Sequence, residues 1–82
     1  MKYGIYTIRD SKVAYDVPFC DNSDQSAVRG FTFAINRSDT MMNANPTDYF
    51  LFKVGEFDNE KGSIKACTPD LICSGIDVFR SE

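Results

Sequence analysis

The side chains that most often perform catalysis are scarce in this sequence. It contains no histidine, which removes the commonest general base together with Cys-His and Ser-His nucleophile pairs. Its five glycines stand apart from one another, so no loop has the run of backbone N–H groups that cradles a phosphate. We therefore expect a protein that is not an enzyme and that uses no cofactor.

The cysteines predict neither a disulfide framework nor a metal site. Cys20, Cys67 and Cys73 are odd in number and lack a Cys-x-x-Cys pair, unlike the cysteines of small secreted scaffolds and zinc motifs. We expect three free, buried thiols, as is usual for cysteine in a reducing compartment. The N-terminal residues lack an apolar run long enough for a signal peptide or membrane helix, so an intracellular location is expected.

Two pairs of acidic residues have the spacing of possible acid–base groups. Asp21 lies near Asp24, and Glu56 lies near Asp58. Catalytic carboxylates need a cleft that perturbs their pKa values, whereas helix capping and turn formation account for all four residues. We therefore assign them structural roles.

Net charge argues against a protein that coats nucleic acid through bulk electrostatics. The chain carries a net charge of −3, so any contact with DNA requires a local patch. Lys53 and Lys65, with Tyr49 beside them in a predicted hairpin, are candidates for a platform that stacks single-stranded DNA. Ordinary packing of a sheet is the alternative explanation for these aromatic residues.

The first half of the chain reads as a hairpin followed by a helix. Residues 2–9 and 13–17 alternate in the manner of strands, and Pro18 ends the second one. Residues 21–25 have the composition of a helix start, with Asn22 or Ser23 as the cap. Helical spacing then places Ala27, Phe31, Ala34 and Ile35 on one stripe, up to an end at Arg37.

The second half is predicted to return to the sheet. Residues 38–47 are polar and read as a loop, and residues 49–57 form the strongest strand. A turn over residues 58–62 uses a positive φ at Gly62, and residues 63–67 return as a strand. Residues 68–73 then read as a short helix capped by Gly75, before a tail or edge strand at 76–79.

These elements predict one α+β domain over residues 1–82. Its small antiparallel sheet has the element order β-β-α-β-β-α, with one main helix packed on the sheet. In strand 49–57, alternation places Tyr49, Leu51 and Phe57 on one face of the sheet. The other face of this strand is apolar as well. Because one helix covers one face, we expect a symmetric homodimer in which Tyr49, Leu51 or Phe57 forms the interface.

One long motif resembles a known family. Asn45–Asp58 has the pattern P-x-D-Y-x-L-x-x-V-G-x-F-D, a glycine follows at Gly62, and Pro18-Phe19 and Ala27-x-Arg29-x-Phe31 lie upstream. This set is similar to the small nonstructural protein of gokushoviruses, which are single-stranded DNA phages of the Microviridae. The resemblance covers most of the chain and ends near Cys67.

The resemblance implies a phage protein of the host bacterial cytoplasm that is absent from the virion, a counterpart of the microvirus C protein. Its implied role in viral DNA replication and packaging is to turn double-stranded replication into single-stranded genome synthesis. Two mechanisms stay open: weak single-stranded DNA binding, and contact with the phage replication protein or procapsid without DNA. Inhibition of a host enzyme is a third reading, since acidic proteins can mimic DNA. The family supplies no catalytic residues.

Overall fold

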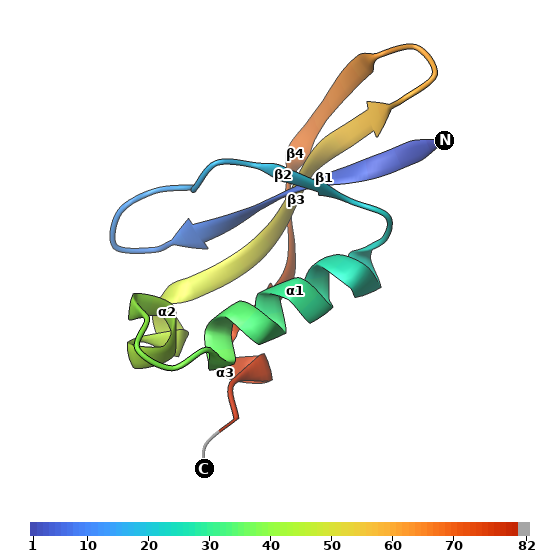
Figure 1. Cartoon of the computed structure of the whole chain (residues 1–82). Coiled ribbons are helices and arrows are strands. Elements are labelled where there is room, and N and C mark those ends of the chain that lie inside the picture. The colour runs from blue at the N-terminus through green and yellow to red at the C-terminus, as the bar shows by residue number, and fades with distance from the viewer. Residues whose placement is uncertain (81–82) are drawn as a thin grey trace.

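The computed structural model of the chain describes residues 1–80. Its elements are, in order, β1 (Lys2–Asp10), β2 (Phe19–Asp21), α1 (Asp24–Asn36), α2 (Met41–Ala44), the 3-10 helix η1 (Pro46–Asp48), β3 (Tyr49–Asp58), β4 (Ser63–Ser74) and α3 (Gly75–Val78). The strands form one antiparallel sheet in the order β2-β1-β3-β4. Helices α1, α2 and α3 lie on one side of the strands (Figure 1). The predicted α+β class is confirmed.

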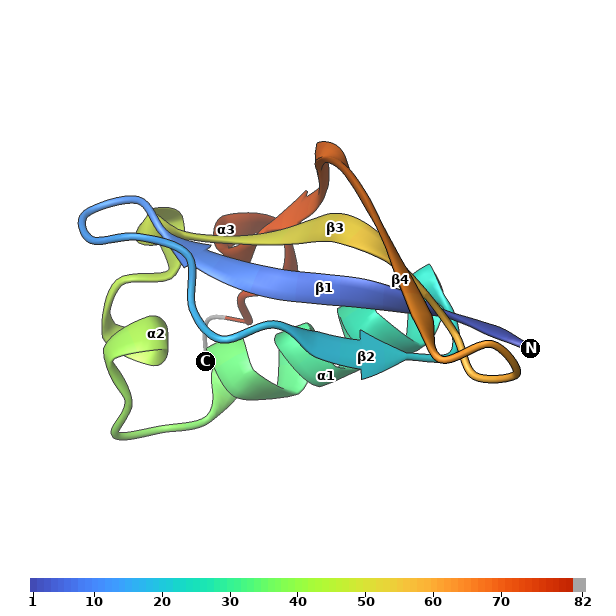
Figure 2. The same ribbon diagram turned by 90° about the horizontal axis from the view of Figure 1, so that it is seen from above.

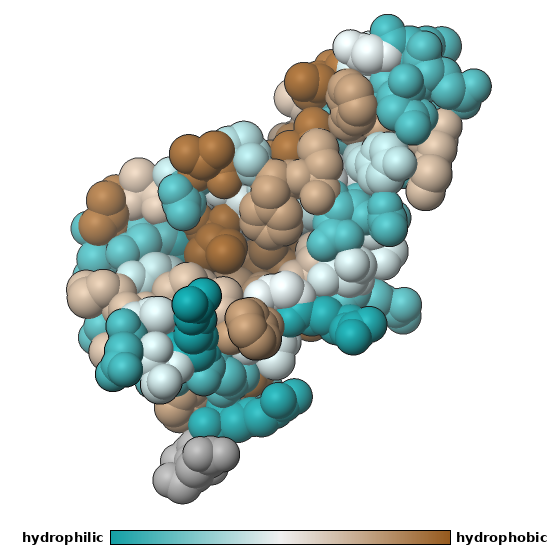
Figure 3. All heavy atoms as spheres, in the orientation of Figure 1, coloured by the Kyte–Doolittle hydropathy of each residue, from teal (hydrophilic) through white to brown (hydrophobic). Residues whose placement is uncertain are grey.

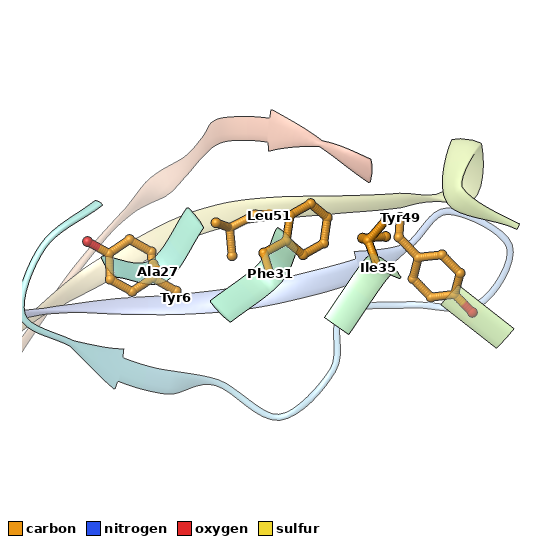
Figure 4. Packing of buried hydrophobic residues seen from close by; sticks show 6 residues of the cluster. All are labelled: Tyr6, Ala27, Phe31, Ile35, Tyr49 and Leu51. Carbon is orange, nitrogen blue, oxygen red and sulfur yellow. The ribbon is translucent and has the colours of Figure 1, made fainter. Parts of the chain in front are cut away.

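Helix α1 forms where its cap and its apolar stripe predict it. The Ser23 side chain accepts a hydrogen bond of 3.1 Å from the Ser26 N–H, which satisfies one of the free donors at the helix start. Three residues on the sheet side of α1 are fully buried against three residues of β1 and β3 (Figure 4): Ala27, Phe31 and Ile35 against Tyr6, Tyr49 and Leu51. Burying each large side chain of this cluster stabilises the fold by roughly 2 kcal/mol.

The register of the strands assigns each side chain to a face. Residues directly opposite each other in an antiparallel pair share a face of the sheet. Tyr6 lies opposite Lys53, and because Tyr6 belongs to the core, this pair marks the face that α1 covers, here called the inner face. The next pair, Thr7 and Phe52, therefore lies on the opposite, outer face.

A β-bulge breaks the alternation of β3. In its pairing with β1, β3 contributes one extra residue, Val54. An extra residue shifts the alternation by one position, so Phe57 lies on the outer face. The prediction that Phe57 shares a face with Tyr49 and Leu51 was therefore wrong, because strict alternation does not continue through a bulge.

Residues 13–17 do not form the predicted strand. Val13 and Val17 are 81% and 80% exposed, and Tyr15 makes one isolated bridge with Arg9. The segment follows β1 as a loop, in which the Asp16 carbonyl accepts a hydrogen bond of 2.8 Å from the Thr7 hydroxyl. Because no neighbouring element covers the valines, the segment gains little from strand pairing and stays a loop. Strand β2 begins only after Pro18.

The predicted loop over residues 38–47 contains two short helical segments. The Thr40 side chain accepts a hydrogen bond of 3.1 Å from the Asn43 N–H and so caps α2. Pro46 begins η1, where its fixed φ suits the first turn and its missing N–H leaves no bond unmade. The loop prediction was wrong for residues 41–44 and 46–47, because polar composition also suits helix caps.

The predicted helix over residues 68–73 is instead a continuation of β4. Asp70 and Leu71 pair with Lys53 and Phe52 of β3. Pairing along β3 outweighs a single helical turn, whose nucleation is unfavourable. Pro69 is tolerated because it falls in the irregular stretch between the paired residues Ala66 and Asp70.

Gly62 and Gly75 differ in how well their predicted roles fit. Gly62 has the expected positive φ of 66° at the turn between β3 and β4. Gly75 does not cap a helix; it begins α3, so the tail or edge strand predicted after it was wrong. A Cβ atom at Gly75 would collide with the Pro46 carbonyl oxygen and lie 2.8 Å from Cδ1 of Ile35. Its role is therefore close packing of α3 against η1 and α1.

Candidate binding surfaces

The outer face of the sheet carries an apolar surface that the helices leave uncovered. Figure 2 shows α1 on the far side of the strands, and Figure 3 shows hydrophobic side chains along the strands up to the polar tip of the β3–β4 hairpin. Ile64 and Leu71 of β4 are 71% and 53% exposed. We call this surface the outer patch, and its members are Tyr3, Ile5, Tyr15, Phe50, Phe52, Phe57, Ile64 and Leu71.

An aromatic cluster gives one end of the outer patch a defined geometry. The rings of Tyr15 and Phe52 meet edge to face, with centroids 5.5 Å apart. The Arg9 guanidinium lies 4.7 Å from the centroid of the Tyr15 ring, a favourable cation–π arrangement. The loop after β1 thus extends the outer patch beyond the strands themselves.

Lys53, a predicted DNA ligand, lies on the inner face among carboxylates. Its Nζ is 3.9 Å from an Asp24 carboxylate oxygen, and its side chain is 27% exposed. Asp70 lies opposite Lys53 on β4. Because opposite charges within this range favour each other, Lys53 holds α1 to the sheet and its charge is offset locally.

Lys65 and Tyr49 do not join Lys53 in a stacking platform. Lys65 is exposed but lies opposite Glu56, so it too has an acidic neighbour. Tyr49 is 8% exposed and belongs to the core. The structure brings the two lysines to one end of the inner face and leaves the tyrosine ring out of reach of a base.

The three residues predicted for self-association are also divided by the fold. Tyr49 and Leu51 are buried beneath α1, whereas Phe57 is half-buried on the outer face. Self-association itself stays a prediction, and its candidate surface is now the outer patch.

Asp24 links three elements through Tyr6 and Lys53. The Tyr6 hydroxyl donates a hydrogen bond of 2.5 Å to the Asp24 carboxylate. Burial, and then this bond to a negative group, raise the pKa of Tyr6 well above its usual range. Ser23 rather than Asp24 caps the helix, and the structural role of Asp24 is to tether α1 to β1.

Two of the three thiols are exposed. Cys20 and Cys67 lie on the surface, contrary to the expected burial, because β2 and β4 are the two edges of the sheet. Cys73 is half-buried, and burial followed by the charge of Asp77 raises the pKa of its thiol. Within residues 1–80, no three Cys, Asp or Glu side chains gather in a group that could hold a metal ion.

The outward side of α1 carries a basic groove that the sequence patterns above did not reveal. Arg29, Phe33 and Arg37 are spaced by four residues and exposed, so they lie along one stripe of the helix. With Arg80 they line a groove of about 580 Å³. The repeat Arg-x3-Phe-x3-Arg could have indicated this stripe, but Arg80 joins it only in the folded chain.

None of the helices in the described part of the chain is long and apolar enough to cross a membrane. The fold and surfaces define a small α+β protein whose candidate sites are an uncovered sheet face and a basic helix face. A protein-family model described as "Phage ORF5 protein" matches residues 3–78. The chain therefore belongs to the phage ORF5 protein family. No curated protein and no solved structure matches it.

Proposed function

We propose that this phage protein is the gokushovirus counterpart of the microvirus C protein and acts without catalysis. In this proposal it works in the host bacterial cytoplasm and is absent from the virion. It promotes the switch to single-stranded genome synthesis and packaging by binding a protein of the replication complex or the procapsid. The observation that carries the proposal is the outer patch, an apolar and aromatic sheet face left uncovered by its own helices.

The apolar and aromatic composition of the outer patch suits binding to another protein. Contiguous apolar patches on small proteins commonly mark interaction sites, and aromatic residues and arginine are enriched at the centres of such sites. Phe52, Tyr15 and Arg9 supply this combination. Direct DNA binding through Lys53, Lys65 and Tyr49 is less well supported, because both lysines face carboxylates and the tyrosine is buried.

The test uses phage that encode the substitutions Ile64→Asp and Leu71→Asp. Both side chains are exposed, so a charge there should disturb an interface more than the fold. In infected cells we expect normal double-stranded replicative DNA and at least a severalfold fall in single-stranded genomes. Capture of the replication protein or procapsid by the purified protein should be lost with the variant and unaffected by nuclease.

Met41→Asp is the matched control, because Met41 is 70% exposed on α2, away from the outer patch. It should leave both measurements unchanged. An unchanged ratio of single-stranded to double-stranded DNA with the outer-patch variant would show that the proposal is wrong.

A further inference from the structure

We propose that the groove on the outward side of α1 binds single-stranded nucleic acid, with backbone phosphates on Arg29, Arg37 and Arg80 and a base stacked on Phe33. Phe33 is two residues beyond the core residue Phe31, which places it on the opposite side of the helix. It is 70% exposed. An aromatic ring held away from its own core is free to take a stacking partner.

The charge of the groove is opposite to that of the whole protein. The chain has nine basic residues and a net charge of −3, yet among residues 1–80 the groove is lined by three arginines and by no carboxylate. Within residues 1–80, neither Arg29 nor Arg37 forms an ion pair. Guanidinium groups bind phosphate oxygens in pairs of parallel hydrogen bonds. The groove therefore attracts a polyanion that the rest of the surface repels.

Asn36 builds the groove by fixing the chain after α3 beside the end of α1. Its side-chain amide donates hydrogen bonds to the carbonyls of Thr32 and Val78, at 2.8 and 2.9 Å. Its side-chain oxygen accepts a bond of 2.7 Å from the Arg80 N–H. The backbone of Arg80 is thus held next to the helix stripe, so this part of the chain does not have to be brought into place when a ligand binds.

The arrangement of groups favours a single strand over a duplex or an acidic peptide. Arg29 and Arg37 lie one helical turn on either side of Phe33. A single strand offers phosphates and unpaired bases together. A duplex keeps its bases stacked inside the helix, and an acidic peptide has no bases to stack on Phe33.

A second hollow adjoins the groove and extends it. This hollow of about 360 Å³ shares Asn36, Ser38 and Arg80 with the groove and adds Asn43 and Phe79. This second hollow lengthens the path along which a strand can lie, and its amide side chain can bond to base edges.

The test is fluorescence anisotropy of labelled oligothymidylate and oligouridylate with the full chain at low salt. With three arginine contacts, the logarithm of affinity should fall against the logarithm of salt with a slope of about −2. Arg29→Gln with Arg37→Gln should reduce that slope by about 1.4. Phe33→Ala should weaken binding roughly tenfold and leave the slope unchanged. Whichever oligonucleotide binds more tightly identifies the natural strand.

The matched control is Lys12→Gln with Lys61→Gln, two exposed cations elsewhere whose loss changes net charge equally. It should bind as the parent protein does, and thermal melting checks that every variant is folded. Equal binding by the arginine variant and this control overturns the proposal. So does tighter binding of a DNA duplex, or equal competition by polyglutamate. The groove and the outer patch lie on different surfaces, so this proposal stands or fails independently of the proposed function.

Discussion

At the scale of single residues, polar side chains in this protein hold elements together. Asp24 caps nothing by itself; it accepts from Tyr6 and pairs with Lys53. Asn36 makes two hydrogen bonds that join α1 to α3 and to the chain after it, one with the Val78 carbonyl and one with the Arg80 N–H. Such bonds contribute about 1 kcal/mol each, and more where one partner is charged.

Tyr6→Phe should lower stability most below about pH 10, where the contribution of the Tyr6 hydroxyl is fully present, and less at alkaline pH, where the parent protein loses it. The pKa of Tyr6 is raised in the folded protein, so above about pH 10 the unfolded chain loses its phenolic proton first. The free energy of unfolding should then fall by up to about 1.4 kcal/mol per pH unit from this group. Urea unfolding from about pH 8 to about pH 11 brackets the ordinary pKa of tyrosine. Over this range the free energy of unfolding should decline less steeply for the variant than for the parent protein. Identical slopes would contradict this assignment.

The three thiols should react in two classes. We expect Cys20 and Cys67 to react rapidly with a thiol reagent, since both are exposed, and Cys73 to react slowly, since burial raises its pKa and limits access. Denaturant should then make all three equally reactive without a reducing agent. Fewer than three reactive thiols in the unfolded chain would indicate a disulfide.

At the scale of elements, local preference and tertiary packing compete most clearly at the glycines. Gly30 lies inside α1, and a Cβ atom there meets nothing within 4 Å. Gly75 lies where α3, η1 and α1 meet. The same substitution should therefore have opposite effects at the two positions.

Gly30→Ala should raise the free energy of unfolding by about 1 kcal/mol, because alanine loses less backbone entropy in a helix. Gly75→Ala should lower it by more than about 1 kcal/mol, because the added methyl group forces packed atoms apart. Thermal melting measures both, and shifts of roughly 4–8 °C per kcal/mol are expected at this size. Destabilisation by Gly30→Ala would show that α1 is strained there.

At the scale of the whole molecule, the chain exposes more surface than its mass requires. A compact monomer of 9.2 kDa is expected to expose about 4,900 Å², whereas this chain exposes 5571 Å². Its dimensions of 44 × 22 × 18 Å reflect the β3–β4 hairpin, which extends beyond the helix layer (Figure 1). An elongated molecule with one uncovered sheet face is suited to association.

We predict that, without another partner, the protein forms a symmetric dimer through the outer patch. Burial of Phe57, Ile64 and Leu71 against a second copy removes apolar area from water. Sedimentation at micromolar concentration should show twice 9.2 kDa, and Ile64→Asp should restore the monomer while Met41→Asp does not. A monomer of the unchanged protein would leave the outer patch to other partners alone.

The sequence by itself determined the parts of this protein that local chemistry specifies. The N-cap and apolar stripe fixed α1, the turn residues fixed the β3–β4 connection, and alternation fixed β1 and most of β3. Each of these signals is read within one element, where hydrogen-bonding and burial preferences agree. The α+β class followed from them.

Only the tertiary structure decided which side chains meet. The bulge at Val54 moved Phe57 to the outer face, and pairing with β3 turned a predicted helix into the end of β4. Lys53 became the partner of Asp24, and Arg80 reached α1 through Asn36 across 44 residues of chain. These outcomes depend on register and on contacts between distant segments, because pairing energy is shared across strands and outweighs the local preference of any one of them.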